Sequence, residues 1–220
     1  TKLSSNENPH GPSPDAVRAV EAAAADVNVY PKASHTDLTD RIAEKWEIDA
    51  KQVWVSAGAD GAIDYLSRAF LEPGDEMLVP EPGFSYYPMS ARYHHGETST
   101  YPVSKDDDFE QSAEHVLSSY DGERIVYVTT PHNPTGSVLE ADEVRALANG
   151  VHDQTLVVVD EAYAEYHDAP SAIELLDEYD NLAVLRTFSK AYGLAGLRIG
   201  YAAVPEAWAD AYARGNTPFA

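Results

Sequence analysis

Short runs of consecutive apolar residues recur along the chain, and most are followed by a stretch with helical spacing. In Ile125–Val128 and Leu156–Val159 the apolar residues do not alternate with polar ones. This is typical of strands that helices cover on both faces. Strands that alternate with helices also favour parallel pairing through helical crossovers. The sequence therefore predicts an α/β fold, a three-layer α/β/α sandwich around a mostly parallel sheet.

The expected elements follow an extended arm, because turn-forming Asn, Pro and Ser dominate residues 6–14. Strands are expected at Val53–Val55, Glu76–Val79, Thr98–Val103, Arg124–Thr129, Thr155–Val159, Ala183–Thr187 and Ile199–Val204. Helices are expected at Asp15–Ala25, Thr36–Trp46, Ala59–Phe70, Phe84–Tyr93, Gln111–Ser118, Glu140–Asn149 and Glu206–Arg214.

The chain is strongly acidic. Its 220 residues include 37 Asp and Glu against 15 Lys and Arg, which gives a formal net charge of −22. Such a charge repels phosphate backbones and argues against nucleic-acid binding. Together with the run Asp106–Asp108, it favours a protein adapted to high salt, which screens self-repulsion because the Debye length falls to about 3 Å at 1 M. An ordinary acidic protein is the alternative.

Several kinds of site and location are disfavoured. The sequence has no Cys, which excludes disulfides, thiolate metal sites and a Cys nucleophile. His94 and His95 have no carboxylate or Cys partner at metal-ligand spacing, so no metal site is expected. No apolar run approaches the roughly 20 residues of a membrane span, and no signal-peptide pattern opens the chain. We therefore expect a cytoplasmic protein that does not bind membranes.

Polar or glycine-containing segments follow four of the apolar runs. In open α/β sheets, ligands bind at the carboxyl ends of the strands, so these four segments are candidate binding sites. Taken singly, each segment is explained by an ordinary turn. Asp160 and Glu161 resemble the magnesium-binding acid of a nucleotidase, but no phosphate-binding P-loop is present. The hydrolase patterns S-x-x-K and G-x-S-x-G are also absent. The segments are Ser56–Gly61, Pro131–Gly136, Asp160–Tyr163 and Thr187–Lys190, the last followed by Gly196–Arg198.

In this order, the four segments resemble the fold-type I enzymes that use pyridoxal 5′-phosphate (PLP), and the resemblance covers nearly the whole chain. Further segments resemble the histidinol-phosphate aminotransferase family. That resemblance implies a homodimer that uses PLP to transfer an amino group between L-histidinol phosphate and 2-oxoglutarate in histidine biosynthesis. These further segments are Asn6–Pro9, Gly11–Pro14, Tyr30 with Pro31, Ala59 with Asp60, and Ala195–Arg198.

Other functions remain open at this stage. A threonine-phosphate decarboxylase shares much of the N-terminal pattern, and an aromatic or branched-chain aminotransferase is a third candidate. A PLP-binding regulatory module without catalysis is a candidate from a different class.

The resemblance also divides the chain into an arm and helix at 1–29 and a PLP-binding large domain at 30–220. Since the chain begins at Thr1 and stops at Ala220 after an expected helix, we expect a C-terminal small domain, with the arginine for the substrate carboxylate, to be missing.

The resemblance assigns roles around the cofactor ring. Lys190 matches the lysine that forms a Schiff base with PLP and later shuttles a proton, which requires a neutral amine and a depressed pKa. Asp160 matches the carboxylate that faces the pyridine nitrogen and keeps it protonated. Tyr163 and Asn133 match the pair that hydrogen-bonds the 3′ oxygen of the ring. Phe84 matches the aromatic residue that stacks on the ring.

The resemblance also assigns residues to the cofactor phosphate. At a helix N-terminus, backbone N–H groups of Ala59 and Asp60 are expected to bind the cofactor phosphate. Tyr30 matches a residue that reaches this phosphate from the partner subunit. The expected side-chain donors are Thr187, Ser189 and Arg198.

The substrate residues are expected in the arm. Glu7 offers an acceptor to the N–H of a substrate imidazole, and Asn6, Asn8, Tyr86 and Tyr87 would flank that ring. The alternative is that Glu7 only caps the arm. His10 stands where relatives have Tyr near the substrate phosphate; it is predicted either to donate to that phosphate or to lie in solvent.

Overall fold

A computed structural model describes residues 4–31, 36–208 and 211, and within these residues seven strands form one sheet. The strand order is β1-β7-β6-β5-β4-β2-β3. β7 runs antiparallel to β1 and β6, and the other neighbours are parallel. The strands are β1 (Val53–Ser56), β2 (Glu76–Glu81), β3 (Glu97–Pro102), β4 (Ile125–Thr129), β5 (Leu156–Asp160), β6 (Leu182–Thr187) and β7 (Gly200–Ala203).

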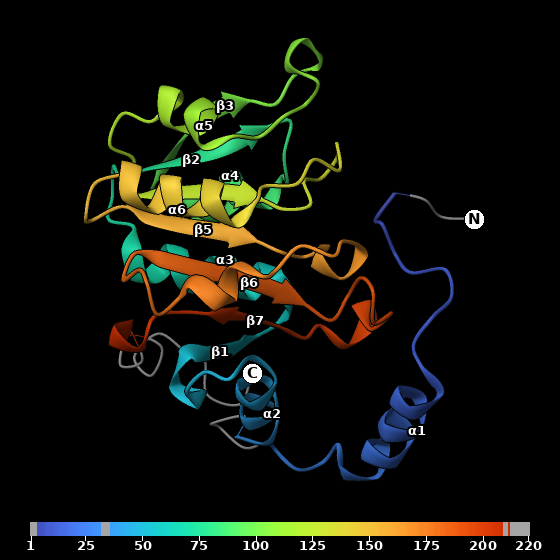
Figure 1. Cartoon of the computed structure of the whole chain (residues 1–220). Helices are drawn as coiled ribbons and strands as arrows, with labels where there is room; N and C mark the ends of the chain where they lie inside the picture. The colour runs from blue at the N-terminus through green and yellow to red at the C-terminus, as the bar shows by residue number, and fades with distance from the viewer. Residues whose placement is uncertain (1–3, 32–35, 209–210, 212–220) are drawn as a thin grey trace.

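Helices cover both faces of this sheet (Figure 1). Because successive side chains of a strand point to opposite faces, neighbours in β4 enter different cores. Val126 belongs to the core that includes residues of α2, α5 and α6, whereas Tyr127 belongs to the core that includes residues of α3 and α4. The predicted three-layer α/β/α sandwich with a mostly parallel sheet is thus confirmed. These helices are α2 (Thr36–Trp46), α3 (Gly58–Phe70), α4 (Tyr86–Tyr93), α5 (Ala113–Ser119) and α6 (Ala141–Gly150).

The expected elements are present, and most of their ends differ from the expectation by one or two residues. The helix expected from Phe84 begins at Tyr86, after a loop that brings Phe84 to the candidate site. The helix expected at Glu206–Arg214 begins as a 3-10 turn at Glu206–Trp208, and most of its remainder lies outside the described residues. Among the described residues, no helix combines the length and apolar character of a membrane span.

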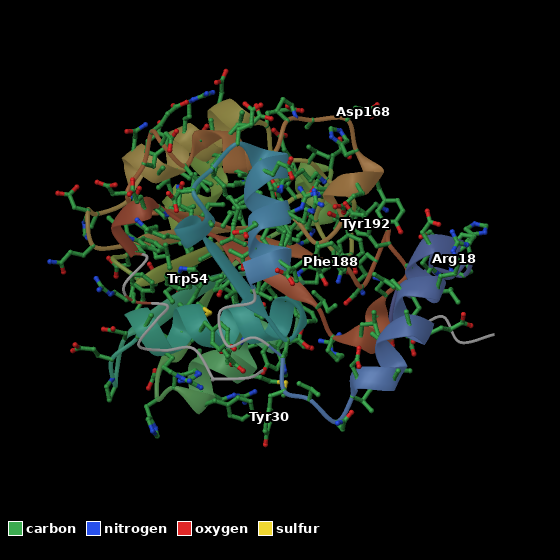
Figure 2. The ribbon with its side chains drawn as sticks, turned by 90° about the horizontal axis from the view of Figure 1, so that it is seen from below. Arg18, Tyr30, Trp54, Asp168, Phe188 and Tyr192 are labelled. Atoms are coloured by element: carbon green, nitrogen blue, oxygen red, sulfur yellow. The ribbon has the colours of Figure 1, made fainter. Side chains whose placement is uncertain are left out.

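The N-terminal arm and α1 (Pro14–Ala23) lie beside the sheet and are not part of its layers (Figure 1). Ser13 caps α1 by accepting a hydrogen bond from the backbone of Ala16. No residue of α1 is buried, and its apolar residues Val17 and Val20 are exposed. Figure 2 shows Arg18 of this helix at the periphery of the molecule. Packing within the described chain therefore does not explain where α1 lies.

Candidate active site

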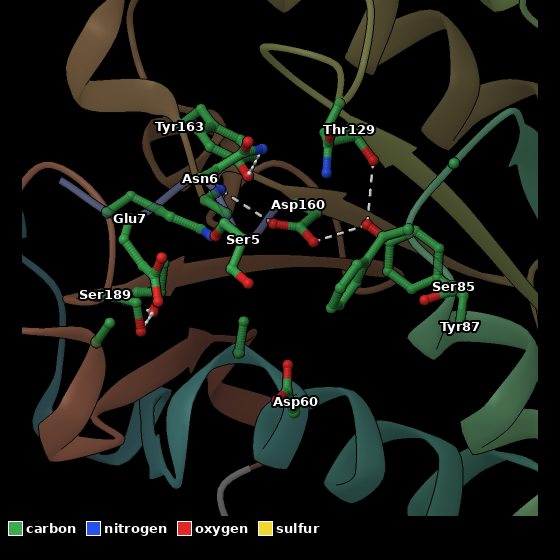
Figure 3. A pocket seen from close by; sticks show the side chains of 18 of the residues that line it. Ser5, Asn6, Glu7, Asp60, Ser85, Tyr87, Thr129, Asp160, Tyr163 and Ser189 are labelled. Carbon is green, nitrogen blue, oxygen red and sulfur yellow. Dashed lines mark hydrogen bonds between the residues drawn. The ribbon is translucent and has the colours of Figure 1, made fainter. Parts of the chain in front are cut away.

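A cavity of about 470 Å³ lies at the carboxyl ends of β4, β5 and β6 (Figure 3). Small-molecule sites typically measure roughly 300–1,000 Å³. The arm, the start of α3, the loop before α4 and the loops after these three strands all contribute to its lining. The predicted site residues that line the cavity are Asn6, Glu7, Ala59, Asp60, Phe84, Tyr87, Asn133, Asp160, Tyr163, Thr187, Ser189, Lys190 and Arg198.

Asp160 ends β5 and is 3% exposed. Its Oδ2 accepts a 2.7 Å hydrogen bond from the Tyr87 hydroxyl, and its Oδ1 accepts one of 3.0 Å from the backbone N–H of Ala162. Burial raises the pKa of Asp160, while these two donors act in the opposite direction because they stabilise the carboxylate. The site thus contains a buried acid whose charged form is supported by hydrogen bonds.

Tyr87 is the residue whose role the sequence analysis missed. It is fully buried, stacks on Tyr127 with ring centroids 4.4 Å apart, and its hydroxyl also lies 3.1 Å from Thr129 Oγ1. The sequence predicts that Tyr86 and Tyr87 flank a substrate imidazole; of these two residues, Tyr87 lines the cavity and Tyr86 does not. The Tyr87 hydroxyl bonds Asp160, and the Tyr86 hydroxyl donates to Asp64 of α3 at 2.8 Å.

Asn133 is presented by a tight loop after β4. The backbone N–H of Gly136 donates to the His132 carbonyl at 2.7 Å, and the His132 N–H donates to Ser137 at the same distance. The His132 ring is buried, and its Nδ1 lies 2.8 Å from Thr135 Oγ1. Burial lowers the pKa of His132, so the imidazole is neutral near pH 7. The bonds within the loop fix the position from which Asn133 reaches the cavity.

Lys190 lies under the arm. Its Nζ donates to the Ser5 carbonyl at 3.0 Å and lies 5.4 Å from the centre of the Tyr163 ring. Asn6 donates to the Tyr163 hydroxyl at 2.9 Å, and Asn8 donates to the Ala191 carbonyl at the same distance. The arm therefore contacts the two loops that carry the predicted catalytic Lys190 and Tyr163 (Figure 3).

Gly193 lets the arm come close to the Lys190 loop. A Cβ at this position would overlap the backbone of Gly11, and the φ of 69° is one that side chains rarely adopt. Any larger residue would displace either the loop or the arm.

The opposite end of the cavity suits an anion. α3 begins there with Ala57 as its N-cap, which gives no side-chain acceptor, so N–H groups of the first turn remain for a ligand. Ser189 accepts a 3.0 Å hydrogen bond from Thr187 and lies 3.5 Å from Arg198 Nη1. Arg198 Nη2 also pairs with the Asp60 carboxylate at 3.0 Å. The Asp60 carboxylate thus pairs with the arginine at this end of the cavity.

A backbone constraint marks this end of the cavity. Arg198 has φ 53°, which costs a non-glycine residue about 1–2 kcal/mol. Gly58 faces it, and a Cβ at Gly58 would overlap the guanidinium. The close approach of these two segments is what places the Arg198 side chain at the start of α3.

A comparison with known protein families shows to which family the chain belongs. The family described as aminotransferase class I and II matches residues 1–220. The chain belongs to this family. The aminotransferase fold accounts for the parallel sheet and for the cavity at its carboxyl edge.

Two relatives of this chain carry the same activity in their names. It is 72% identical over 219 residues to the histidinol-phosphate aminotransferase of Haloquadratum walsbyi, and 72% identical over 220 residues to that of Haloferax volcanii. It covers 58% and 61% of the lengths of these two proteins, so it spans about three fifths of them. The acidic composition fits these halophilic relatives.

A solved structure supports the same grouping. The histidinol-phosphate aminotransferase of Sinorhizobium meliloti, solved in complex with pyridoxal 5′-phosphate, is 32% identical with a TM-score of 0.90. The match covers 98% of this chain and 59% of the solved chain.

Besides Tyr86, three predicted residues are not among those that line the cavity. Asn8 bonds the Lys190 loop from outside it, and His10 is exposed, with its backbone N–H bonded to the Asn8 side chain at 2.9 Å. Tyr30 is 80% exposed and labelled at the edge of the molecule in Figure 2. Within this chain, therefore, Tyr30 does not reach the site.

Proposed function

We propose that the full-length protein is a histidinol-phosphate aminotransferase, which uses PLP to transfer an amino group between L-histidinol phosphate and 2-oxoglutarate in histidine biosynthesis. The observation that carries this proposal is the cavity that brings together Lys190, the buried Asp160 and the anion-binding end at Arg198. High identity to two histidinol-phosphate aminotransferases supports the choice of substrate. Neither the other aminotransferases, nor the decarboxylase, nor the regulatory module is favoured by these relatives.

The residues of the cavity fit PLP. Lys190 would bind its aldehyde carbon, Asp160 its pyridine nitrogen, and Phe84 one face of its ring, while Tyr163 and Asn133 would bind the 3′ oxygen. When bound, PLP supplies an electron sink for the bonds at the substrate Cα. The phosphate would be held by the N–H groups of Ala59 and Asp60 and by the side chains of Thr187, Ser189 and Arg198.

The protein's own groups would prepare and move the proton. Lys190 must leave the Ser5 carbonyl and be neutral before its amine takes the proton from the substrate Cα. Asp160 must be ionised to hold a proton on the pyridine nitrogen, and Tyr87 favours that ionised form. The arm, which covers the mouth of the cavity near Tyr163, would exclude water from this chemistry.

Substrate recognition is proposed to involve the arm. Glu7 lines the cavity and is placed to accept from the imidazole N–H of histidinol phosphate. Asn8 would act by fixing the arm against Ala191, and His10 would donate to the substrate phosphate from the surface of the arm.

The assembly is proposed to be a homodimer. α1 buries none of its residues, and Tyr30 and Val29 beyond it are strongly exposed, so this segment has apolar surface available for a second subunit. Tyr30 of the partner subunit would then complete the phosphate site.

We further propose that the arm and helix at 1–29 and the large domain at 30–220 are separate units. The location that we propose for this acidic protein is the cytoplasm.

The substrate is tested with the full-length protein and PLP. Glutamate should form from histidinol phosphate and 2-oxoglutarate. Release of carbon dioxide from threonine phosphate, without any transamination of histidinol phosphate, would overturn the proposal.

The lysine that binds the cofactor is tested separately. Borohydride reduction followed by peptide mapping should place the cofactor label on Lys190, and a label on another lysine would reject that assignment.

A further inference from the structure

Arg186 occupies an unusual position between two glutamates. It lies in β6, its side chain is 6% exposed, and its two terminal nitrogens bond different carboxylates. Nη1 donates to Glu161 Oε2 and Nη2 donates to Glu165 Oε1, each at 2.6 Å. These glutamates lie two residues before and two residues after Tyr163. The guanidinium thus grips the turn that carries Tyr163 from both sides.

Further contacts hold the Arg186 guanidinium and its two glutamates in place. Glu161 also accepts 2.6 Å hydrogen bonds from Ser171 Oγ and the backbone N–H of Ala172. The Trp46 ring of α2 lies 5.1 Å from the guanidinium carbon, and its indole N–H donates to the Tyr201 hydroxyl at 2.8 Å. Planar guanidinium groups suit such stacking and two-pronged binding, which a lysine ammonium does not reproduce.

The charge of Arg186 matters because of where the acids lie. Asp160 and Glu161 are consecutive and both buried, and Glu165 is only partly exposed. Burying several carboxylates without a cation nearby is strongly unfavourable. Arg186 therefore allows the turn after β5 to stay buried beside the cavity instead of opening toward water.

We propose that Arg186 is a positioning residue, which ties the turn bearing Tyr163 to the strand that leads to Lys190. Arg186 precedes Lys190 by four residues, so one side chain links the two loops that carry the proposed catalytic phenol and amine. The role of Tyr163 in this inference rests on the proposed function, but the tie between the loops does not.

The test compares Arg186→Lys and Glu165→Gln with Arg145→Lys in the full-length protein. Arg145 is a matched control, since it also binds two carboxylates, Glu178 at 3.0 and 3.1 Å and Asp142 at 3.0 Å, on the surface. Amide hydrogen exchange of residues 161–171 is measured without PLP. The pH midpoint of the absorbance change of bound PLP is measured separately, with Tyr163→Phe as the reference.

Arg186→Lys should accelerate exchange in 161–171 by about tenfold, because the turn opens locally more often. Its absorbance midpoint should move in the same direction as that of Tyr163→Phe, by a smaller amount. Glu165→Gln should give smaller changes of both kinds, and it keeps the test decisive if Arg186→Lys does not fold.

Two results would overturn the proposal. One is exchange in 161–171 that matches the Arg145→Lys control. The other is faster exchange with an unmoved absorbance midpoint, which would make Arg186 merely structural. Failure of the wild-type protein to bind PLP would count against the proposed function instead, and the exchange comparison would still decide whether the loops are tied.

Discussion

The inner wall of the cavity and the arm that covers its mouth are built in opposite ways. The wall at β5 and β6 includes the buried Asp160, and it is supported by the buried Glu161 and Arg186, which do not line the cavity; each of the three has several partners. The arm is largely exposed and meets the wall through hydrogen bonds of Ser5, Asn6 and Asn8. The wall is therefore set by buried contacts of the fold itself, whereas the arm keeps its place through a few hydrogen bonds at the surface.

The first prediction concerns Asp160, the buried acid in the wall of the cavity. Asp160→Asn keeps the size of the side chain but removes the charge, so turnover with histidinol phosphate should fall on the order of 100- to 1,000-fold, as for other loss of fixed charge stabilisation. Steady-state kinetics of the full-length protein would measure this, with Asp142→Asn on the surface as a control. Near-normal turnover with PLP bound would contradict the assigned role.

The second prediction concerns the outermost segment, which would complete the site of another subunit. Tyr30→Ala and Lys190→Ala should each be nearly inactive, but a mixture of the two should regain up to about a quarter of wild-type activity, because half of the dimers carry one intact site. Assays after proven subunit exchange would show this. If exchange occurs and activity does not return, the two subunits do not share the site.

The third prediction removes one hydroxyl behind the acid. Tyr87→Phe should lower kcat/KM about tenfold, since hydrogen bonds to charged groups contribute about 1.5–3 kcal/mol and part of this is retained. The Tyr87 hydroxyl stabilises the carboxylate, so its loss raises the pKa of Asp160 further. In the proposed function the ionised form of Asp160 is the active one, and the acid limb of the pH profile should therefore move to higher pH.

A matched control exists for this change. Tyr101 is equally buried, but its hydroxyl donates to Gln111 at 2.9 Å, away from Asp160. Tyr101→Phe should leave the acid limb where it is. A common shift in both variants would mean that the effect comes from general loosening of the core.

The smallest effect is expected in the arm. Asn6→Ala removes one exposed hydrogen bond to the Tyr163 hydroxyl and should raise KM by about two- to fivefold with little change in unfolding temperature, since such bonds contribute about 0.5–1.5 kcal/mol. Kinetics and thermal unfolding of the same preparation would measure both. A large drop in unfolding temperature would show that the arm belongs to the rigid wall.

Much of the site could be predicted because its residues follow apolar strands directly. Asp160 and Thr187 end their strands, and Lys190 comes three residues later, so the parallel sheet alone brings them to one edge. Resemblance then supplied their proposed roles. Tyr87 could not be found in this way, because it approaches Asp160 from a helix 73 residues earlier in the chain.

The sequence by itself determined the succession of strands and helices along the chain, the burial of the strands and the loops that carry the candidate site. These features depend on local patterns of apolar and turn-forming residues. The tertiary structure decided the antiparallel β7, the bond from Tyr87 to Asp160, the grip of Arg186 on two glutamates and the contact of Ser5 with Lys190. These features join segments far apart in the chain. They depend on which strands become neighbours and how helices pack on them, and no local pattern of residues contains that information.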